Sequence, residues 1–353
     1  MTDTRTRMRI ALVTSALLVA ALLGAGCSAK KPAEVTSAWP QANSEKVIPA
    51  PPVPPTWPLS GLVAPNAASG KKRPLSIKVE NSPVARPQTG LNSADVVYET
   101  VTEGGITRFH LIFQSKVPKI VGPVRSARLS DLWIVPQYRG IFFYSGASSS
   151  VTSRVRQANL PDMSQDVGVS APYFRSSARS APHNLYLTTK KAYADAKRRG
   201  HKITAKVPEL EFGPASITTS ASAVKSVYIP FSGFNNVTWK YDKTRKVFLR
   251  ENNHRVHRDA ETGKQVAAKN VVVMWAKYTA ASHDMVGSVT YDIQLGGTGK
   301  ATIFRDGKRY NGEWVATRTQ PPHFVDKNGR PIRLAPGNTW MQVVPLDVNI
   351  SMK

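Results

Sequence analysis

One glutamate and three arginines bracket an apolar run in the segment EGGITRFHLIFQSKVPKIVGPVRSAR, residues 103–128. Glu103 precedes a Gly-Gly bend, Arg108 follows it, and Arg125 and Arg128 come after a Gly-Pro turn. Arginine grips carboxylate and phosphate oxygens through pairs of parallel hydrogen bonds. The segment therefore predicts either an internal network of glutamate and arginine or a site for an anionic ligand.

The preceding run, ADVVYETVTEGG, adds two further carboxylates. If it is a strand, Asp95, Val97, Glu99, Val101 and Glu103 share one face. Glu99 and Glu103 would then be roughly 13 Å apart along the strand. Paired glycosidase carboxylates are only about 5 to 9.5 Å apart. These two are not predicted to be such a pair, and each needs a partner from another segment.

The run RSARLSDLWIVPQY, residues 125–138, is predicted to be a helix with Ser126 as its N-cap. Arg125 and Arg128 would flank that cap. A helix N-terminus attracts anions, so two arginines there oppose the helix dipole unless a negative group lies between them. Glu103 or a ligand phosphate or carboxylate would supply that group.

A histidine and a serine extend the set of reactive side chains. His183, beside Asn184 in SAPHNLYLTT, follows a proline-ordered turn and has the chemistry of a general base or of a hydrogen-bond donor to an anion. Ser148 in YSGASSS ends an apolar strand, but the second glycine of G-x-S-x-G is absent. A helix cap is therefore favoured for Ser148 over a Ser148–His183–Asp triad.

The loop ENSPVARPQTG carries Arg86 and Gln88, whose predicted role is ligand contact or stabilisation of the turn. Two sets of candidates result. The acid/base candidates are Glu103 and His183. The ligand-binding candidates are Arg86, Gln88, Glu99, Arg108, Arg125, Arg128 and Asn184.

The elements that must position these residues change in character along the chain. Strand-like runs such as RPLSIKVEN alternate with predicted helices at 125–138, 148–159 and 188–199. From residue 226 short strands follow one another, separated by turn residues such as DG, NG and KNG. The predicted fold class is α+β: an N-terminal mixed α/β module and then an all-β module, a sandwich or open barrel.

The first residues predict export. MTDTRTRMRI is a basic n-region, an apolar run follows, and Cys27, the only cysteine, comes directly after GAG. Ala25 and Gly26 resemble a bacterial lipid-attachment motif, whereas Gly24 departs from it. The predicted organisation is a signal peptide at 1–26, an acylated Cys27 (carrying, for example, palmitate) with a proline-rich tether at 27–72, modules at 73–205 and 226–353, and a linker at 206–225. An uncleaved membrane anchor is the alternative for the apolar run.

Charge and composition narrow the classes of partner. The chain has 48 lysines and arginines against 23 acidic residues, a formal net charge of +25. Such a balance favours polyanionic partners. Because export removes the chain from nucleic acid, anionic wall polymers, glycans and the membrane remain as the expected partners. A lone cysteine excludes internal disulfides and thiolate metal sites. His254 and His257 have no further ligand motif, so neither a metal nor a cofactor is expected.

Several sequence blocks carry a family resemblance. They are RPLSIKVENSPVARPQTGLNSADVVYETVTEGGITRFHLIFQS, GPVRSAR, APHNLYLTT and, late in the chain, AKNVVV, RDGKRYNGEW and LAPGNTWMQVVP. Together they resemble the YerB-like lipoproteins over residues 73–345. The resemblance implies an exported, membrane-anchored protein with a mixed N-terminal module and a β C-terminal module. It implies no mechanism, because the family has no known molecular function.

The residues and the resemblance together predict a lipid-anchored protein on the extracytoplasmic face of the cell membrane that binds an anionic envelope ligand. Arg108, Arg125 and Arg128 would hold the anion. One alternative is a hydrolase or transferase acting on a wall glycan or phosphodiester, with Glu103 and His183 as acid and base. The other is a scaffold that binds another envelope protein through its β module.

Overall fold

The structure, a computed structural model, describes residues 53–215, 221–283 and 289–353. The predicted signal peptide, Cys27 and the first part of the tether lie outside these residues. Within the described part of the chain, no helix is both long and apolar enough to cross a bilayer.

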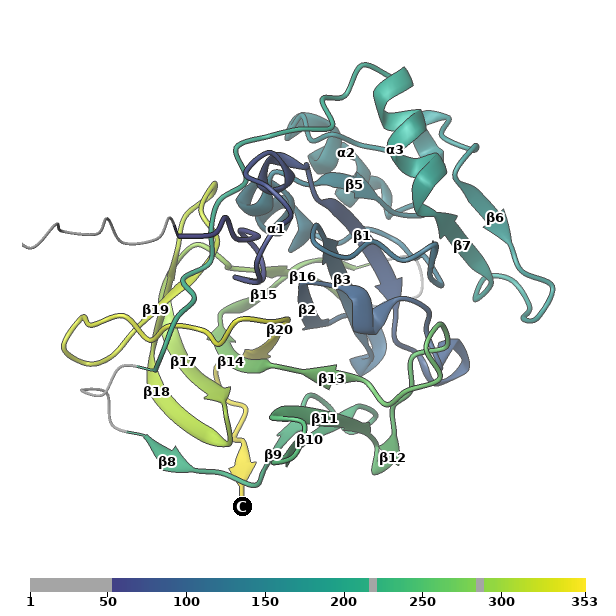
Figure 1. Ribbon diagram of the computed structural model, residues 1–353. Coiled ribbons are helices and arrows are strands. Elements are labelled where there is room, and N and C mark those ends of the chain that lie inside the picture. Colours follow the sequence, from purple (N-terminus) through teal and green to yellow (C-terminus); the bar gives the residue numbers. More distant parts are fainter. Residues whose placement is uncertain (1–52, 216–220, 284–288) are drawn as a thin grey trace, which may run out of the picture. The chain divides into compact units, whose positions relative to one another are not determined.

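One large mixed sheet is the frame of the body (Figure 1). Strands from both modules contribute to it, because β20 pairs in parallel with β2 on one side and with β14 on the other. The two modules therefore share a single ladder of hydrogen bonds. In spatial order the strands are β19 (His323–Val325), β18 (Lys308–Ala316), β17 (Gly297–Arg305), β14 (Asn270–Ala276), β20 (Thr339–Pro345), β2 (Val96–Val101), β3 (Thr107–Phe113), β1 (Leu75–Glu80) and β5 (Ile141–Phe143), with β8 (Ser222–Ala223) paired to β18.

Three smaller sheets accompany the frame. The largest of them comes entirely from the C-terminal module and consists of β12 (Arg255–Val256), β11 (Val247–Asn252), β10 (Asn236–Asp242), β9 (Ser226–Pro230) and β21 (Ser351–Met352), with β13 (Ala267–Ala268) on β11. The other two are β4 (Ile120–Val121), β7 (Leu185–Thr188) and β6 (Tyr173–Arg175), and the hairpin of β15 (Tyr278–His283) and β16 (Val289–Ile293).

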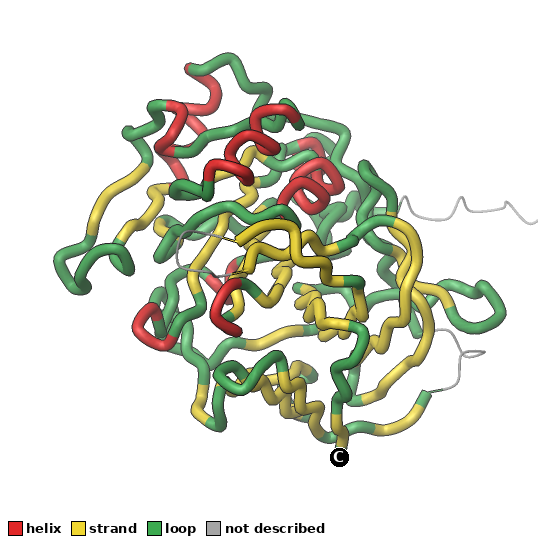
Figure 2. The backbone as a smooth tube through the Cα atoms, turned by 180° about the vertical axis from the view of Figure 1, so that it is seen from behind, coloured by secondary structure: helices red, strands yellow, loops and turns green. Residues whose placement is uncertain are grey.

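The α-helices among the described residues belong to the N-terminal module, and in the view from behind helical segments gather mainly in the upper part (Figure 2). The α-helices are α1 (Asp131–Tyr138), α2 (Ser149–Gln157) and α3 (Thr189–Arg198). Short 3₁₀ turns join other elements: η1 (Ser69–Lys71), η2 (Pro83–Ala85), η3 (Leu91–Ser93), η4 (Glu103–Gly105) and η5 (Gln165–Val167).

The predicted fold class is confirmed: a mixed α/β module precedes a module in which the described residues form strands and loops. The smaller C-terminal sheet packs face to face on the large one. Trp239 of β10 meets Trp340 of β20 with ring centroids 5.1 Å apart. Along β2, Val97 and Val101 point to this interface, whereas Val96 and Tyr98 point to the core on the other face. Alternation along one strand thus supplies two cores.

Two predicted helices are confirmed with their ends. Ser148 stands at the N-cap of α2, and Thr188 at the N-cap of α3. Gly200, just past α3, has a φ of +84°, a conformation that glycine adopts without steric cost. These boundaries follow from local residue types alone.

The start of the first predicted helix is wrong. The helix begins at Asp131, with Ser130 at its N-cap, and Ser126 lies outside it. Residues 125–127 are committed elsewhere: the Arg125 N–H donates to the Lys78 carbonyl, and the Ala127 N–H donates to the Gly146 carbonyl. Because these donors bind distant segments, the chain stays extended there.

The packed body extends to the N-terminal side of Arg73. Leu59 is fully buried in the same core as Tyr98, and Thr56 pairs with Val63 across a short bridge. In the region between the modules, Val207 and Leu210 are buried in that core as well. Apolar residues among the prolines therefore anchor this segment to the fold.

The glycine-rich motif GGTGK, residues 296–300, lies mostly in a strand, because residues 297–300 belong to β17. Gly299 lies opposite Trp314 of β18. A Cβ at this position would lie 2.6 Å from the indole nitrogen of Trp314 and 2.8 Å from the carbonyl oxygen of Trp275. The glycine is required by close packing on a buried tryptophan.

Gly299→Ala should therefore lower the free energy of unfolding by roughly 1–3 kcal/mol, since the added methyl group overpacks a core. Gly233→Ala is the matched control, because a Cβ at Gly233 meets no atom within 4 Å. Urea unfolding of both variants measures the difference. Equal midpoints for the two variants would show that the Trp314 contact does not constrain the strand.

Candidate functional site

The polar candidates divide between the two faces of the three neighbouring strands β1, β2 and β3. Glu80 of β1 pairs with Arg108 of β3, and these side chains share one face. Asn81, one residue further, joins Glu99 of β2 on the opposite face. We call the first group the arginine cluster and the second the junction network; their members are Glu80, Glu103, Arg108, Arg125, Arg128 and His183 for the cluster, and Asn81, Arg86, Gln88, Glu99, Asn235, Arg250, Asn252 and His257 for the network.

In the arginine cluster, Glu103 binds Arg128. The Arg128 Nε and Nη2 atoms donate to Glu103 Oε2 at 2.9 and 2.6 Å. Burial alone would raise the pKa of Glu103, but the charge and hydrogen bonds of Arg128 outweigh it, so the pKa is lowered. Glu103 is consequently ionised near neutral pH and is poorly suited to act as a proton donor.

Glu80 holds the histidine of the cluster. The His183 Nδ1 atom donates to Glu80 Oε1 at 2.9 Å, and Arg125 Nε lies 3.5 Å from Glu80 Oε2. Glu80 is buried, whereas the side chains of Arg125 and His183 are 24% and 29% exposed. A buried carboxylate therefore orients an imidazole and a guanidinium that solvent reaches.

Arg108 is the buried cation of the cluster. Its Nη1 atom donates to the Ser126 carbonyl at 3.3 Å, and its Nε atom has no hydrogen-bond partner among the described residues. Burial lowers the pKa of Arg108 to about 9, and repulsion from Arg128 and Arg125 adds to the shift, while Glu103 and Glu80 oppose it. Burial is thus the main cause of the lowered pKa, and the neighbouring charges act on it in both directions.

A second charged group lies on the same face, fully buried. The Lys78 Nζ atom and the His110 Nδ1 atom each donate to Asp131 Oδ1 at 2.8 Å. Asp131 Oδ2 in turn accepts the backbone N–H of Arg128 at 2.7 Å. Burial opposes ionisation of Asp131, but Lys78 and His110 keep its pKa well below the usual range. This triad fixes the backbone that carries Arg128.

Asn184 does not join the arginine cluster. Its Oδ1 atom accepts from Arg175 Nη1 at 2.7 Å, and its Nδ2 atom donates to the carbonyls of Ser176 and Arg179. Asn184 thus orders the loop that precedes His183.

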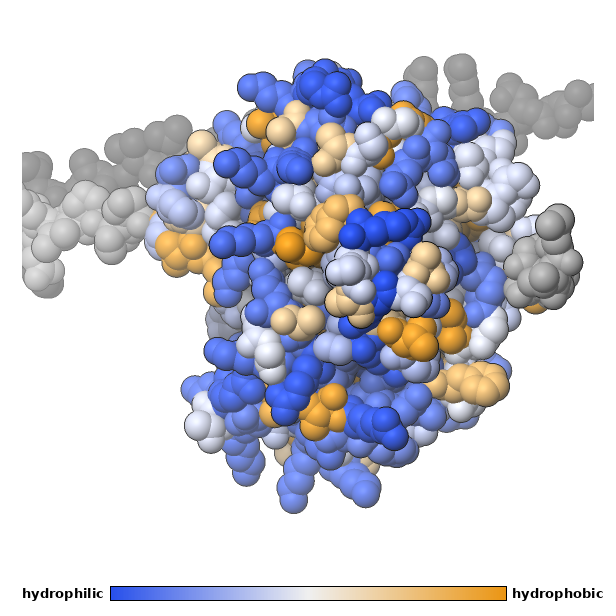
Figure 3. Space-filling view, turned by 90° about the vertical axis from the view of Figure 1, so that its right-hand side faces the viewer, coloured by the Kyte–Doolittle hydropathy of each residue, from blue (hydrophilic) through white to orange (hydrophobic). Residues whose placement is uncertain are grey.

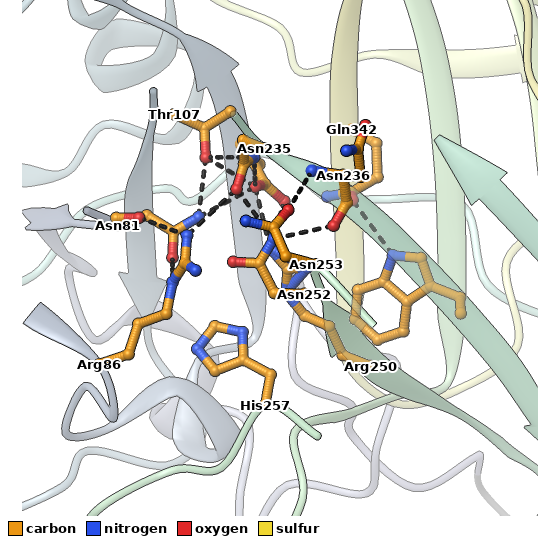
Figure 4. A network of polar contacts seen from close by, with 12 residues as sticks. Asn81, Arg86, Thr107, Asn235, Asn236, Arg250, Asn252, Asn253, His257 and Gln342 are labelled. Carbon is orange, nitrogen blue, oxygen red and sulfur yellow. Dashed lines mark hydrogen bonds and ion pairs between the residues drawn. The ribbon is translucent and has the colours of Figure 1, made fainter. Parts of the chain in front are cut away.

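The junction network is centred on a buried ion pair between the modules (Figure 4). The Arg250 Nη2 atom of β11 lies 2.9 and 3.0 Å from the two carboxylate oxygens of Glu99 on β2, and both side chains are fully buried. Thr107, Asn81 and Asn235 also donate to Glu99 Oε1, at 2.8, 3.2 and 3.3 Å. The carboxylate is therefore paired and well supplied with donors.

Aromatic rings enclose the guanidinium of this pair. The Arg250 Cζ atom lies 5.4 Å from the ring centroid of Phe109, 5.6 Å from that of Trp239 and 5.2 Å from that of Trp340. Burial lowers the pKa of Arg250, and Glu99 opposes the shift. Contacts between the cation and the rings replace part of the lost hydration.

Arg86 and Gln88 extend the network towards the surface. The Arg86 guanidinium donates to the side chain and carbonyl of Asn81 and to Asn235 Oδ1. Burial, with added repulsion from Arg250, lowers the pKa of Arg86 to about 10. Gln88 bridges Asn81 and His257. The loop after β1 is thereby tied to the C-terminal module.

The predicted single face of carboxylates is wrong. Strand β2 ends at Val101, so Glu103 lies in the turn η4 and reaches Arg128 on the opposite face from Glu99. Asp95 precedes the strand and accepts hydrogen bonds from the backbone of Gln114 and Ser115. The three carboxylates therefore belong to three separate groups of hydrogen bonds.

The other candidates from the sequence contact neighbouring side chains of the fold. The Ser148 Oγ atom lies 3.2 Å from Ser150 Oγ, while His183 is bound to Glu80. His254 stacks on Tyr228 at the β11–β12 turn. Within residues 53–215, 221–283 and 289–353, no group of three His, Cys, Asp or Glu side chains has a metal-binding arrangement.

Sequence reasoning missed several members of both groups and the buried triad beside the cluster. Glu80 of the cluster, and Asp131 and Lys78 of the triad, interrupt apolar runs as single charged residues, which is a weak signal of burial with partners. Arg250 stands in KVFLREN, where an arginine on an amphipathic strand is normally taken as solvent-exposed. Asn235 and Asn252 gave no signal, since asparagine is common in turns.

Comparisons with known proteins agree with this architecture. A family model described as "Protein of unknown function (DUF3048) N-terminal domain" matches residues 59–202, and the corresponding C-terminal domain matches residues 227–341. Together these matches cover the mixed module and the β module of a two-module protein.

The chain belongs to this YerB-like family. "Putative lipoprotein YerB" of Bacillus subtilis (strain 168) is 32% identical over 294 residues, which are 82% of this chain and 86% of the relative. The crystal structure of the YerB protein from Bacillus subtilis is 31% identical, with a TM-score of 0.74 over 84% of this chain and 99% of that chain.

Arg250→Met should lower the free energy of unfolding by roughly 3–5 kcal/mol, because it leaves the Glu99 carboxylate buried without its cation. The double variant Glu99→Gln/Arg250→Met should cost less than the sum of the two single changes. Urea unfolding measures all three. Arg154→Met is the control, since Arg154 and its partner Asp292 are 52% and 40% exposed. A loss for Arg250→Met no larger than for Arg154→Met would contradict the role of the pair.

Glu103→Gln should flatten the dependence of stability on pH below pH 4.5. The pKa of Glu103 is lower in the folded chain than its ordinary value of 4.5. The unfolded chain therefore binds more protons just below pH 4.5, and the contribution of Glu103, present above that value, is lost as the pH falls through its folded pKa. Urea midpoints above and below pH 4.5 measure this, with Glu209→Gln as an exposed control. Identical acid-limb slopes for Glu103→Gln and the unsubstituted protein would exclude the effect.

Proposed function

We propose that this chain is a lipid-anchored extracytoplasmic protein that binds an anionic ligand of the cell envelope through its arginine cluster. The export signal, Cys27 and a relative named as a lipoprotein support the anchor. The net charge of +25 supports an anionic partner. The proposal concerns the class of ligand and the residues that contact it.

The observation that carries the proposal is the unequal charge of the cluster. The three arginines Arg108, Arg125 and Arg128 face only two carboxylates, those of Glu80 and Glu103. Lys78 and Asp131 beneath them neutralise each other. An anion at the surface of the cluster would offset the remaining positive charge and would favour the charged form of Arg108.

Arg125 is the side chain best placed to contact such an anion. Within the described residues its guanidinium donates no hydrogen bond, and its one ion pair, with Glu80, is long at 3.5 Å. The Arg125 side chain is 24% exposed, so an oxyanion can approach it from solvent.

The ligand class follows from guanidinium chemistry. Arginine binds phosphate and carboxylate oxygens bidentately, and an envelope protein meets both groups on wall polymers and glycans. Hydrophilic residues cover most of the side of the molecule on which β6, β7 and β12 lie, with hydrophobic residues in small separate areas (Figure 3). A soluble, charged polymer suits such a surface.

The pair of His183 and Glu80 favours a second candidate, a hydrolase or transferase acting on a wall glycan or phosphodiester. The carboxylate fixes Nδ1 as the protonated nitrogen, so Nε2 is left to accept a proton. Arg125 beside the pair would stabilise developing negative charge. In this candidate His183 carries the proton transfer, because Arg128 keeps Glu103 ionised.

The test uses full-length protein in detergent micelles and a purified polyol-phosphate wall polymer. Arg125→Ser should weaken binding roughly tenfold or more, since it removes a charge-assisted contact. Lys191→Ser on α3 removes one exposed charge elsewhere and should change binding little. Binding should also weaken as salt rises.

Mass spectrometry of the polymer after incubation separates the two candidates. Intact polymer indicates binding alone. Shortened or transferred products that disappear with His183→Ala indicate the enzyme. Equal binding by the unsubstituted protein, Arg125→Ser and Lys191→Ser would show that net charge alone attracts the polymer and would overturn the proposed site.

A further inference from the structure

A cleft of about 590 Å³ lies between the modules, on the junction-network side of β1. The loop that contains η2 forms one wall, and the β11–β12 hairpin with the residues after it forms the other. Pockets of a few hundred Å³ are the usual size for small-molecule sites. The cleft is therefore large enough for a ligand of one or two sugar rings.

The charge of the cleft has one sign. Arg86, Arg255 and Arg258 line it, and no acidic residue does. Arg86 is held in place by Asn81 and Asn235, whereas Arg255 and Arg258 are exposed, and Arg258 also donates to the Gly263 carbonyl. Three guanidinium groups thus line the same space, an arrangement that suits an anionic group.

Asn252, which lines the cleft, carries an unused acceptor. Its Nδ2 atom donates to Asn235 Oδ1 at 2.8 Å and to the Asn236 carbonyl at 2.9 Å, which fixes the orientation of the amide. The Oδ1 atom then accepts no hydrogen bond from any residue that the structure describes, although Asn252 is only 3% exposed. A buried acceptor without a donor is unusual in a folded protein.

His257 offers a second acceptor. Gln88 uses its amide nitrogen to donate to the Glu80 carbonyl and to Asn81, so its Oε1 atom must accept from His257 Nε2, at 2.7 Å. Burial, with repulsion from Arg250 and Arg86, holds the pKa of His257 well below its usual value, so the ring is neutral. Its Nδ1 atom therefore carries a lone pair, and this buried atom has no partner in the described chain.

Arg86, Asn252 and His257 lie beside one another at one end of the junction network (Figure 4). We infer that this cleft binds a sugar or polyol that carries a phosphate or carboxylate group. The arginines would hold the anionic group, and Asn252 Oδ1 and His257 Nδ1 would accept hydrogen bonds from hydroxyl groups. The inference is independent of the arginine cluster, whose side chains lie on the opposite face of β1.

The arginines and the two unpaired acceptors of the cleft together exclude inorganic phosphate and uncharged sugars as its preferred ligands. Inorganic phosphate would satisfy the arginines, but a doubly charged anion has too few donors for both buried acceptors. An uncharged sugar would satisfy the acceptors and leave the cationic side chains without a counter-charge. A hydroxylated anion satisfies both.

Calorimetry on the full-length protein in detergent tests this with four probes. Glucose 6-phosphate and glucuronate represent the two kinds of anionic group, and methyl glucoside and inorganic phosphate each lack one feature. At least one of the first two should bind at least tenfold more tightly than both of the others. The tighter of these two probes identifies the anionic group of the ligand as a phosphate or a carboxylate.

Substitutions in the cleft test whether the probe binds there. Arg255→Ser/Arg258→Ser should weaken binding of the preferred probe at least tenfold, whereas Lys191→Ser/Lys197→Ser removes two exposed charges on α3 and should not. His257→Gln keeps a donor for Gln88 and replaces the ring acceptor at Nδ1 with an amide oxygen in a different position. It should weaken the hydroxylated probe and leave inorganic phosphate unchanged. Thermal unfolding confirms that each variant is folded.

Several outcomes would overturn the inference. If inorganic phosphate binds as tightly as glucose 6-phosphate, the cleft recognises charge alone and not a hydroxylated ligand. Binding unaffected by both Arg255→Ser/Arg258→Ser and His257→Gln would place the probe elsewhere, and so would a loss seen only with Arg125→Ser. Absence of binding by both hydroxylated anions would reject the ligand class. A failure here leaves the polymer test of Arg125 unaffected, so the two proposals stand or fall separately.

Discussion

The ion pair between Glu99 and Arg250 is the constraint on which the rest of the body depends. Each partner comes from a different module, and neither charge has access to water. Because an unpaired buried charge costs several kcal/mol, the modules cannot separate at this point without a large loss of stability. The pairing of β20 with β2 acts in the same direction. Together they hold the two modules in one arrangement, and a preorganised arrangement of the cleft walls lowers the entropy that is lost when a ligand binds.

Strand alternation explains how one short stretch serves two polar sites. Glu80 and Asn81 are neighbours in sequence, yet one organises the arginine cluster and the other the junction network. In the loop that follows β1, the Gln88 side chain donates a hydrogen bond to the backbone carbonyl of Glu80. A change in β1 would therefore affect the two sites at the same time, although their ligands would differ.

Much of the fold follows from local signals, whereas the site depends on tertiary pairing. Strand alternation, the caps Ser148 and Thr188, and the turn residues after residue 226 placed the modules and two helices. The prediction that Ser126 caps the helix failed, because hydrogen bonds to Lys78 of β1 and to Gly146 in the loop after β5 hold residues 125–127 extended. The convergence of arginines on glutamates near residues 103–128 was predictable from the two glycine bends. The partner of Glu99 was not, since nothing in KVFLREN distinguishes a buried Arg250 from an exposed arginine until the aromatic rings of three strands enclose it.

Native-state hydrogen exchange, measured by mass spectrometry on the full-length protein, tests most directly whether the two modules form one cooperative unit. The shared sheet and its buried ion pair predict that peptides from β2, β11 and β20 exchange with the same free energy of opening, equal to that of global unfolding. Exchange of β11 through a separate, lower-energy opening while β1, β2 and β3 stay protected would contradict this account.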